Sequence, residues 1–114
     1  MKISIKATGF DLTPSINVYI EEKLGSLAKF LQKFDITGQP ELWVEIGRTS
    51  RHHTHGVVFR AEADLRLPKK ILRGVEERED VREAIDALKN VLRAEIEKYK
   101  TKAAPRARRA GKSL

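Results

Sequence analysis

Three histidines and two arginines lie close together in the middle of the chain. His52, His53 and His55 are its only histidines, and Arg48 and Arg51 precede them. Imidazole and guanidinium groups donate hydrogen bonds and stack, so this group suits phosphate and unpaired nucleic-acid bases. A zinc site needs three or four converging ligands, and the adjacent His52 and His53 point apart on an extended backbone. We therefore expect neither a metal nor a cofactor here, with a solvated loop or a metal-dependent hydrolase as the alternatives.

Basic residues also recur at helical spacing in two segments. In residues 14–34, Lys29 and Lys33 share a polar flank and Lys23 borders the apolar stripe. In residues 78–100, five basic residues share a flank within an arc of about 60° at 3.6 residues per turn. They are Arg78, Arg82, Lys89, Arg93 and Lys100, with Asp86 at the border of the arc. Grouped, exposed cations favour phosphate, although a solvated helix face would explain either flank alone.

The formal charge of +7 is unevenly distributed along the 114 residues. Residues 1–100 carry a net charge of only +2, whereas residues 101–114 carry +5 and no acidic residue. The basic residues of this terminal segment are Lys102, Arg106, Arg108, Arg109 and Lys112. The segment also contains Pro105 and has too little apolar surface to offset its ordering entropy. We therefore predict one domain over residues 1–102 and a basic, disordered tail over residues 103–114.

Several classes of protein are disfavoured by what the sequence lacks. The absence of cysteine excludes a disulfide scaffold, a thiol nucleophile and a thiolate zinc site. No apolar run approaches the roughly 18 residues of a membrane span, and residues 1–4 are typical of a strand rather than a signal peptide. No glycine-rich phosphate loop and no Ser-His-acid set stands out. We expect a cytoplasmic protein that is not an enzyme and binds neither a membrane nor a small-molecule substrate.

The elements that must position the basic residues follow from hydrophobic periodicity. Residues 2–8 alternate as a half-buried strand, and Thr13 and Pro14 are typical of a helix start. One apolar stripe from Ile16 to Phe34 predicts a single helix, and alternation predicts strands at 41–49, 56–67 and 71–77, with Trp43 facing outward. Gly74 makes the last of these strands less secure. A second helix opens at Asp80.

These elements predict an α+β fold with the order β-α-β-β-β-α. Each helix has one apolar stripe and the strands have one apolar face, so both helices should pack on one face of a four-stranded sheet. The first crossover should be right-handed and join parallel strands, and short antiparallel hairpins should join the rest. Trp43 could stack on a base from the open face, but we favour simple packing.

Four segments resemble the ribosome hibernation promoting factors and ribosome-associated inhibitors, also called the sigma-54 modulation or S30AE family. They are MKISI with FDLTP (residues 1–5 and 10–14), YIEEKL onward (19–30), GRT through RHH to VFRAE (47–62), and Asp80 through AID to KYK (80–100). The resemblance covers residues 1 to about 102 and implies a fold related to double-stranded-RNA-binding domains. It agrees with the order of elements predicted from periodicity.

The resemblance implies binding to the small (30S) ribosomal subunit, in the channel between head and body. Such proteins occupy the space of messenger RNA and of A- and P-site transfer RNA, held by contacts to 16S rRNA phosphates. Lys23, Lys29, Lys98 and Lys100 match basic positions of the family. Ser26, Val91 and Ala94 stand where members often have Lys or Arg, which leaves open which flank of the second helix meets RNA.

Long members of the family carry a further C-terminal domain that pairs ribosomes. The length of this chain predicts a short form, a monomer away from the ribosome, whose tail with Arg106, Arg108 and Arg109 lies along the messenger path. The predicted RNA-binding residues are Lys23, Lys29, Lys33, Arg48, Arg51, His52, His53, Lys89, Arg93, Lys98, Lys100, Arg106, Arg108 and Arg109. The alternative function is a general RNA-binding or RNA-chaperone module without ribosome specificity.

Overall fold

A computed structural model describes residues 1–32, 40–50 and 56–103 of the chain; residues 33–39, 51–55 and 104–114 lie outside the described part. The elements are β1 (Lys2–Thr8), α1 (Pro14–Gly25), a 3-10 helix η1 (Ser26–Phe30), β2 (Glu41–Ser50), β3 (Val57–Leu67), β4 (Lys70–Arg78) and α2 (Val81–Ala103). The predicted order β-α-β-β-β-α is confirmed. None of the helices in the described part is long and apolar enough to cross a membrane.

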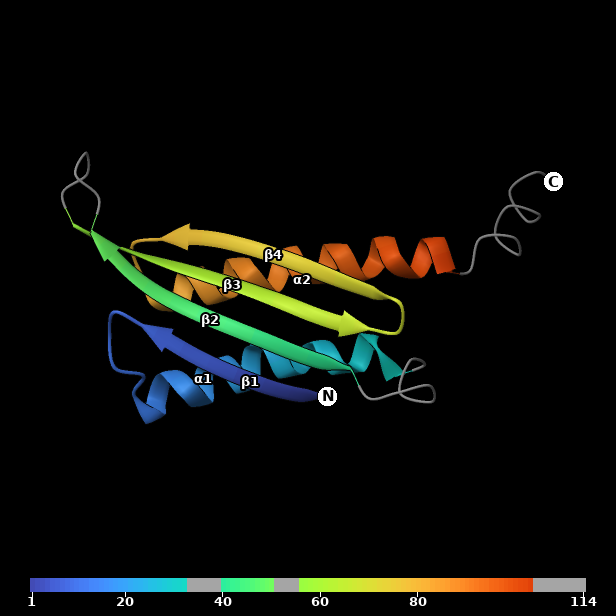
Figure 1. The fold of residues 1–114 in the computed structure, drawn as a ribbon, viewed down its shortest axis with the longest axis horizontal. Coiled ribbons are helices and arrows are strands. Elements are labelled where there is room, and N and C mark those ends of the chain that lie inside the picture. Colours follow the sequence, from blue (N-terminus) through green and yellow to red (C-terminus); the bar gives the residue numbers. More distant parts are fainter. Residues whose placement is uncertain (33–39, 51–55, 104–114) are drawn as a thin grey trace.

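The four strands form one mixed sheet in the order β1-β2-β3-β4. β1 pairs in parallel with β2, and β2–β3 and β3–β4 are antiparallel, as predicted. Both helices lie behind the sheet in Figure 1 and run in the same direction. Their N-termini lie at the end of the sheet where β2 ends and β3 begins. The other face of the sheet is not covered by a helix. Basic residues can therefore lie either on the helices or on this open face of the sheet.

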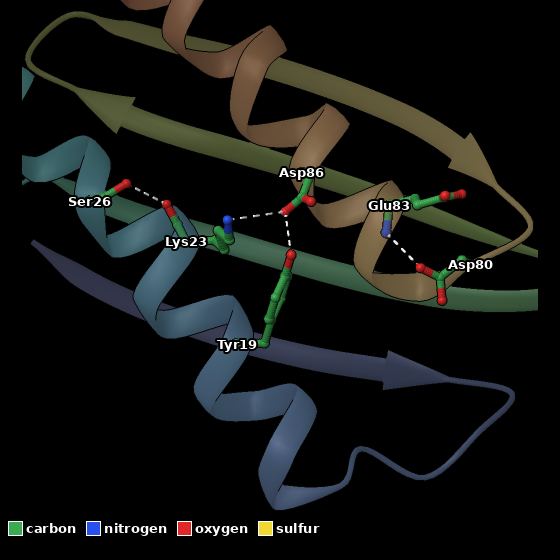
Figure 2. Close-up of polar contacts among 6 residues, drawn as sticks. All are labelled: Tyr19, Lys23, Ser26, Asp80, Glu83 and Asp86. Carbon is green, nitrogen blue, oxygen red and sulfur yellow. Dashed lines mark hydrogen bonds and ion pairs between the residues drawn. The ribbon is translucent and has the colours of Figure 1, made fainter.

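Both helices begin at the caps that the sequence indicates. The Thr13 hydroxyl oxygen accepts a hydrogen bond from the Ile16 amide at 3.2 Å, and Pro14 follows it at the first helical position. The Asp80 carboxylate accepts from the Glu83 amide at 3.2 Å (Figure 2). The start of each helix is therefore fixed by a side chain that satisfies an otherwise unpaired amide.

The prediction of one continuous helix over residues 14–34 is wrong. α1 ends at Gly25, and the chain continues as η1 from Ser26 to Phe30. Glycine is unfavourable inside a helix, and the Ser26 hydroxyl donates to the Lys23 carbonyl at 2.6 Å, which competes with helical hydrogen bonding (Figure 2). The stripe nevertheless survives the change, because Leu27 and Leu31 are both buried. Phe34 lies outside the described residues.

The core lies between the helices and the sheet. It joins Ile20 and Leu24 of α1 to the buried alternate residues of the strands and to the apolar stripe of α2. Gly74 of β4 is buried beneath α2, where an added Cβ would lie 3.0 Å from Val91 and 3.1 Å from Leu88. The glycine that made this strand insecure in the sequence is therefore what lets α2 approach it closely.

Candidate RNA-binding surface

Basic side chains gather where α1 and η1 lie beside α2. Arg82, Lys89, Arg93 and Lys100 recur on one stripe of α2, with Asp86 among them. The facing segment contributes Lys23 from α1 and Lys29 from η1. We call these seven residues the basic seam. Arg78, predicted to share this flank, is not part of it: it ends β4 and pairs with Glu76 at 3.2 Å.

At one part of the seam, Tyr19 of α1 is joined to Asp86 of α2. The Tyr19 hydroxyl donates to Asp86 Oδ1 at 2.6 Å, and Lys23 Nζ lies 3.9 Å from the same oxygen, as Figure 2 shows. The Lys23 ammonium and the Arg82 guanidinium also lie 5.5 and 5.4 Å from the centre of the Tyr19 ring. Asp86 is thus partly neutralised, and its hydrogen bond holds the two helices in a fixed relation.

The same contact changes the acidity of the phenol. The pKa of Tyr19 rises from 10.0 to about 12, chiefly because its hydroxyl donates to Asp86 and secondly because it is partly removed from water. The negative charge of Asp86 adds to the rise, and the positive charge of Arg82 opposes it. Because the folded pKa lies above the unfolded one, the stabilisation is complete below pH 10 and is lost as the pH rises towards about 12.

We expect the Tyr19→Phe variant to lose a tyrosine ionisation centred near pH 12. The tyrosinate absorbance of the wild type minus that of the variant isolates this titration, because Tyr19 and Tyr99 are the only tyrosines. Tyr99→Phe is the control: its hydroxyl donates to the Pro68 carbonyl, away from Asp86, and its loss should leave the late ionisation in place. A difference titration centred at pH 10 would contradict the hydrogen bond between Tyr19 and Asp86.

At a second part of the seam, three cations surround Phe30. The Arg93 guanidinium lies 4.9 Å from the ring centre, and the Lys29 and Lys100 ammonium groups lie at 5.2 and 5.9 Å. Lys29 comes from η1 and the other two come from α2. None of the three forms an ion pair with a carboxylate in the described part of the chain. Among the residues that the structure describes, the positive charge of this part of the seam is therefore not paired with a carboxylate.

The open face of the sheet has the opposite character. Arg73 pairs with Asp64 at 3.2 Å, and Arg60 with Glu62 at 3.6 Å. Trp43 faces outward there, as predicted, with 48% of its surface exposed and the Arg66 guanidinium 4.5 Å from its ring centre. The hollow of about 380 Å³ beside it is lined by three acidic residues, Glu45, Glu62 and Asp64, against a single basic one, Lys6. These carboxylates would repel phosphate, so the seam is the better surface for RNA.

The structure brings together only some of the predicted RNA-binding residues. Lys23, Lys29, Lys89, Arg93 and Lys100 lie on the seam, whereas Arg48 is exposed near the end of β2 and Lys98 pairs with Glu95 at 3.2 Å. Lys33, Arg51, His52, His53, Arg106, Arg108 and Arg109 lie outside the described residues, as does His55. Within the described part, no three His, Cys, Asp or Glu side chains are grouped to hold a metal.

The sequence-based prediction did not include the two aromatic residues that the cations of the seam contact, Tyr19 and Phe30. Both are half-buried and pack at the edge of the core while cations lie over their rings. A signal was present in the sequence. Lys23 follows Tyr19 by one helical turn and Lys29 directly precedes Phe30. An aromatic residue at the border of an apolar stripe, beside lysines, indicates a ring positioned to hold a cation.

Fold and surface together define a small α+β domain with a basic helical face and a sheet face on which Arg60 and Arg73 are paired with carboxylates. The chain belongs to the family described as sigma 54 modulation protein / S30EA ribosomal protein, whose model matches residues 3–104. This confirms the resemblance identified from the four sequence segments.

Individual relatives agree with this assignment. The chain is 28% identical over 105 residues to a ribosome hibernation promotion factor of Lactococcus lactis subsp. cremoris, covering 90% of this chain and 51% of that protein. It thus spans about half the length of this curated relative. Among solved structures, the Thermus thermophilus Protein Y N-terminal domain matches with a TM-score of 0.66 and 25% identity, covering 87% of this chain and 99% of that one. A Coxiella burnetii ribosomal subunit interface protein shares the fold, with a TM-score of 0.68 and 20% identity, over 89% of this chain and 99% of that one.

Proposed function

We propose that this protein is a ribosome hibernation factor that binds the small ribosomal subunit and inhibits translation. In this proposal the domain occupies the decoding channel, where it excludes messenger RNA and A- and P-site transfer RNA. Membership of the family supports the ribosome as partner. The observation that carries the proposal is the contrast between the faces: Arg60 and Arg73 on the sheet are paired, whereas Arg93, Lys29 and Lys100 on the seam are not paired with any described carboxylate.

The mechanism is steric exclusion, and it requires no catalytic group. The cations of the seam contact phosphates of folded 16S rRNA, which positions the domain without reading base sequence. Because both helices contribute cations, their fixed relation through Tyr19 and Asp86 sets the geometry of the contact surface. The channel then cannot hold this domain and the decoding substrates at once. We further propose that the protein acts in the cytoplasm as a monomer when it is off the ribosome.

Co-sedimentation with purified small subunits tests the proposal. At physiological salt we expect the protein to pellet with subunits and to be displaced by transfer RNA together with messenger RNA. Failure to pellet, or binding that these ligands never reduce, would overturn it. Equal affinity for subunits and for bulk RNA would instead support a general RNA-binding or RNA-chaperone module on the same seam.

The terminal segment over residues 103–114 provides a separate prediction. Its removal deletes Arg106, Arg108, Arg109 and Lys112, which we propose contact single-stranded RNA along the messenger path. Binding to small subunits should weaken, and the slope of log affinity against log salt should shrink by about 2 to 3, at about 0.7 per phosphate contact. Replacing the same four residues by glutamine is the matched control for length. An unchanged slope would mean that the segment makes no phosphate contact.

A further inference from the structure

Three cations lie around Phe30, and none of them forms an ion pair with a described carboxylate. Three basic side chains from two elements lie within 5.9 Å of one ring centre. Elsewhere on the seam, the two cations over Tyr19 share their surroundings with Asp86, which lies 3.9 Å from Lys23. Around Phe30 no described carboxylate takes that place. The two groups therefore differ in what they can bind.

Gathering three like charges with no ion pair to a described carboxylate works against the stability of the folded chain. The negative face of the aromatic ring offsets part of this repulsion, because it attracts cations directly. The ring is itself anchored, since Phe30 packs against the core. A local arrangement that conflicts with stability is expected where a functional site lies. The charge of this arrangement is complementary to that of an anion.

We infer that Phe30 is a positioning residue that gathers Lys29, Arg93 and Lys100 into a socket for one phosphodiester group of RNA. The inference rests on the proposed function and deepens it. The Arg93 guanidinium can donate two parallel hydrogen bonds to phosphate oxygens, and the two lysines supply compact charges beside it. The ring holds these long side chains near their bound positions, so less side-chain freedom is lost when phosphate enters.

Loss of the Phe30 ring and loss of one of the cations around it should have different effects on RNA binding. Loss of a cation removes part of the positive charge that neutralises the phosphate, which reduces the dependence of affinity on salt. Loss of the ring leaves all three charges in place but scatters them. Affinity should therefore fall while the salt slope stays the same. A residue with a purely structural role would instead lower the fraction of folded protein.

The test compares Phe30→Leu with Phe10→Leu in the full chain. Phe10 is also half-buried against the core, but its ring contacts Phe59 at 5.5 Å rather than a cation. With a short oligo-uridylate as probe, Phe30→Leu should weaken binding about fivefold to tenfold at an unchanged salt slope, and Phe30→Tyr should restore it. Phe10→Leu should bind as the wild type does. Thermal unfolding of each variant shows what fraction is folded.

Wild-type protein supplies a second readout that needs no substitution. Ring currents should displace the Arg93 and Lys100 side-chain resonances in solution, and oligo-uridylate should shift them further. Undisplaced resonances, equal losses in the Phe30 and Phe10 variants, or normal binding by Phe30→Leu would each overturn the inference. If oligo-uridylate binds the socket but small subunits do not bind the protein, only the proposed function fails. If subunits bind normally to Phe30→Leu, only the socket fails.

Discussion

Replacing Arg93 by glutamate is expected to weaken binding to small ribosomal subunits by about tenfold to a hundredfold. This range corresponds to the loss of one charge-assisted hydrogen-bonding partner of phosphate, worth about 1.5 to 3 kcal/mol. Arg93 is exposed, so the substitution does not disturb the core. The slope of log affinity against log salt should also decrease by about 0.7 to 0.9, because one phosphate contact disappears.

Lys98→Glu is the matched control, because it changes the net charge by the same amount. Lys98 lies about 140° from Arg93 around α2, by the geometry of the helix, and pairs with Glu95 at 3.2 Å. Its replacement should change the affinity only a few-fold, through long-range electrostatics. Quantitative co-sedimentation at several salt concentrations measures both variants. Equal losses would show that net charge, rather than the position of the seam, determines binding.

The sequence predicted only part of the site, as Arg93 and Lys98 illustrate. Helical spacing alone identified Lys89, Arg93 and Lys100 as one flank, because periodicity determines which residues share a face. It could not show that α1 faces this flank, since contacts between helices depend on tertiary packing. The family resemblance predicted that Lys98 binds RNA. In the structure this residue lies on another side of α2 and pairs with Glu95. Tyr19 and Phe30 were not predicted as part of the site, because a half-buried ring at the border of an apolar stripe has the same pattern as an ordinary core residue.

The fold was more predictable than the site for a physical reason. Alternating and helical patterns record burial, and burial largely decides which elements form and how they pack. The prediction for the first helix failed at Gly25 and Ser26, where local hydrogen bonding by Ser26 competes with a stripe that continues beyond it. Gly74 made the strand prediction less secure, whereas the structure shows that a glycine is needed there because α2 packs directly over it. Local sequence does not contain that neighbour.

Replacing Leu92 by alanine should lower the free energy of unfolding by about 2 to 5 kcal/mol. Leu92 is fully buried in the core, on the side of α2 that packs over β4, where its Cδ2 would lie 3.4 Å from a Cβ at Gly74. Truncation there leaves a cavity that close packing cannot easily fill. Val18→Ala is the control: Val18 lies on α1 with half of its surface exposed, and its replacement should change the stability by at most about 0.5 kcal/mol.

Urea denaturation followed by circular dichroism and by the fluorescence of Trp43, the single tryptophan, measures both variants. A loss below about 1 kcal/mol for Leu92→Ala would contradict the packing of α2 on the sheet. Total stability is of the order of 5 to 15 kcal/mol for a domain, so this variant should bind subunits only in proportion to its folded fraction. Arg93→Glu should instead stay folded and lose affinity. Leu92 and Arg93 are neighbours on one helix, about 100° apart around its axis. The first would then be shown to stabilise the fold that carries the seam, and the second to contact RNA.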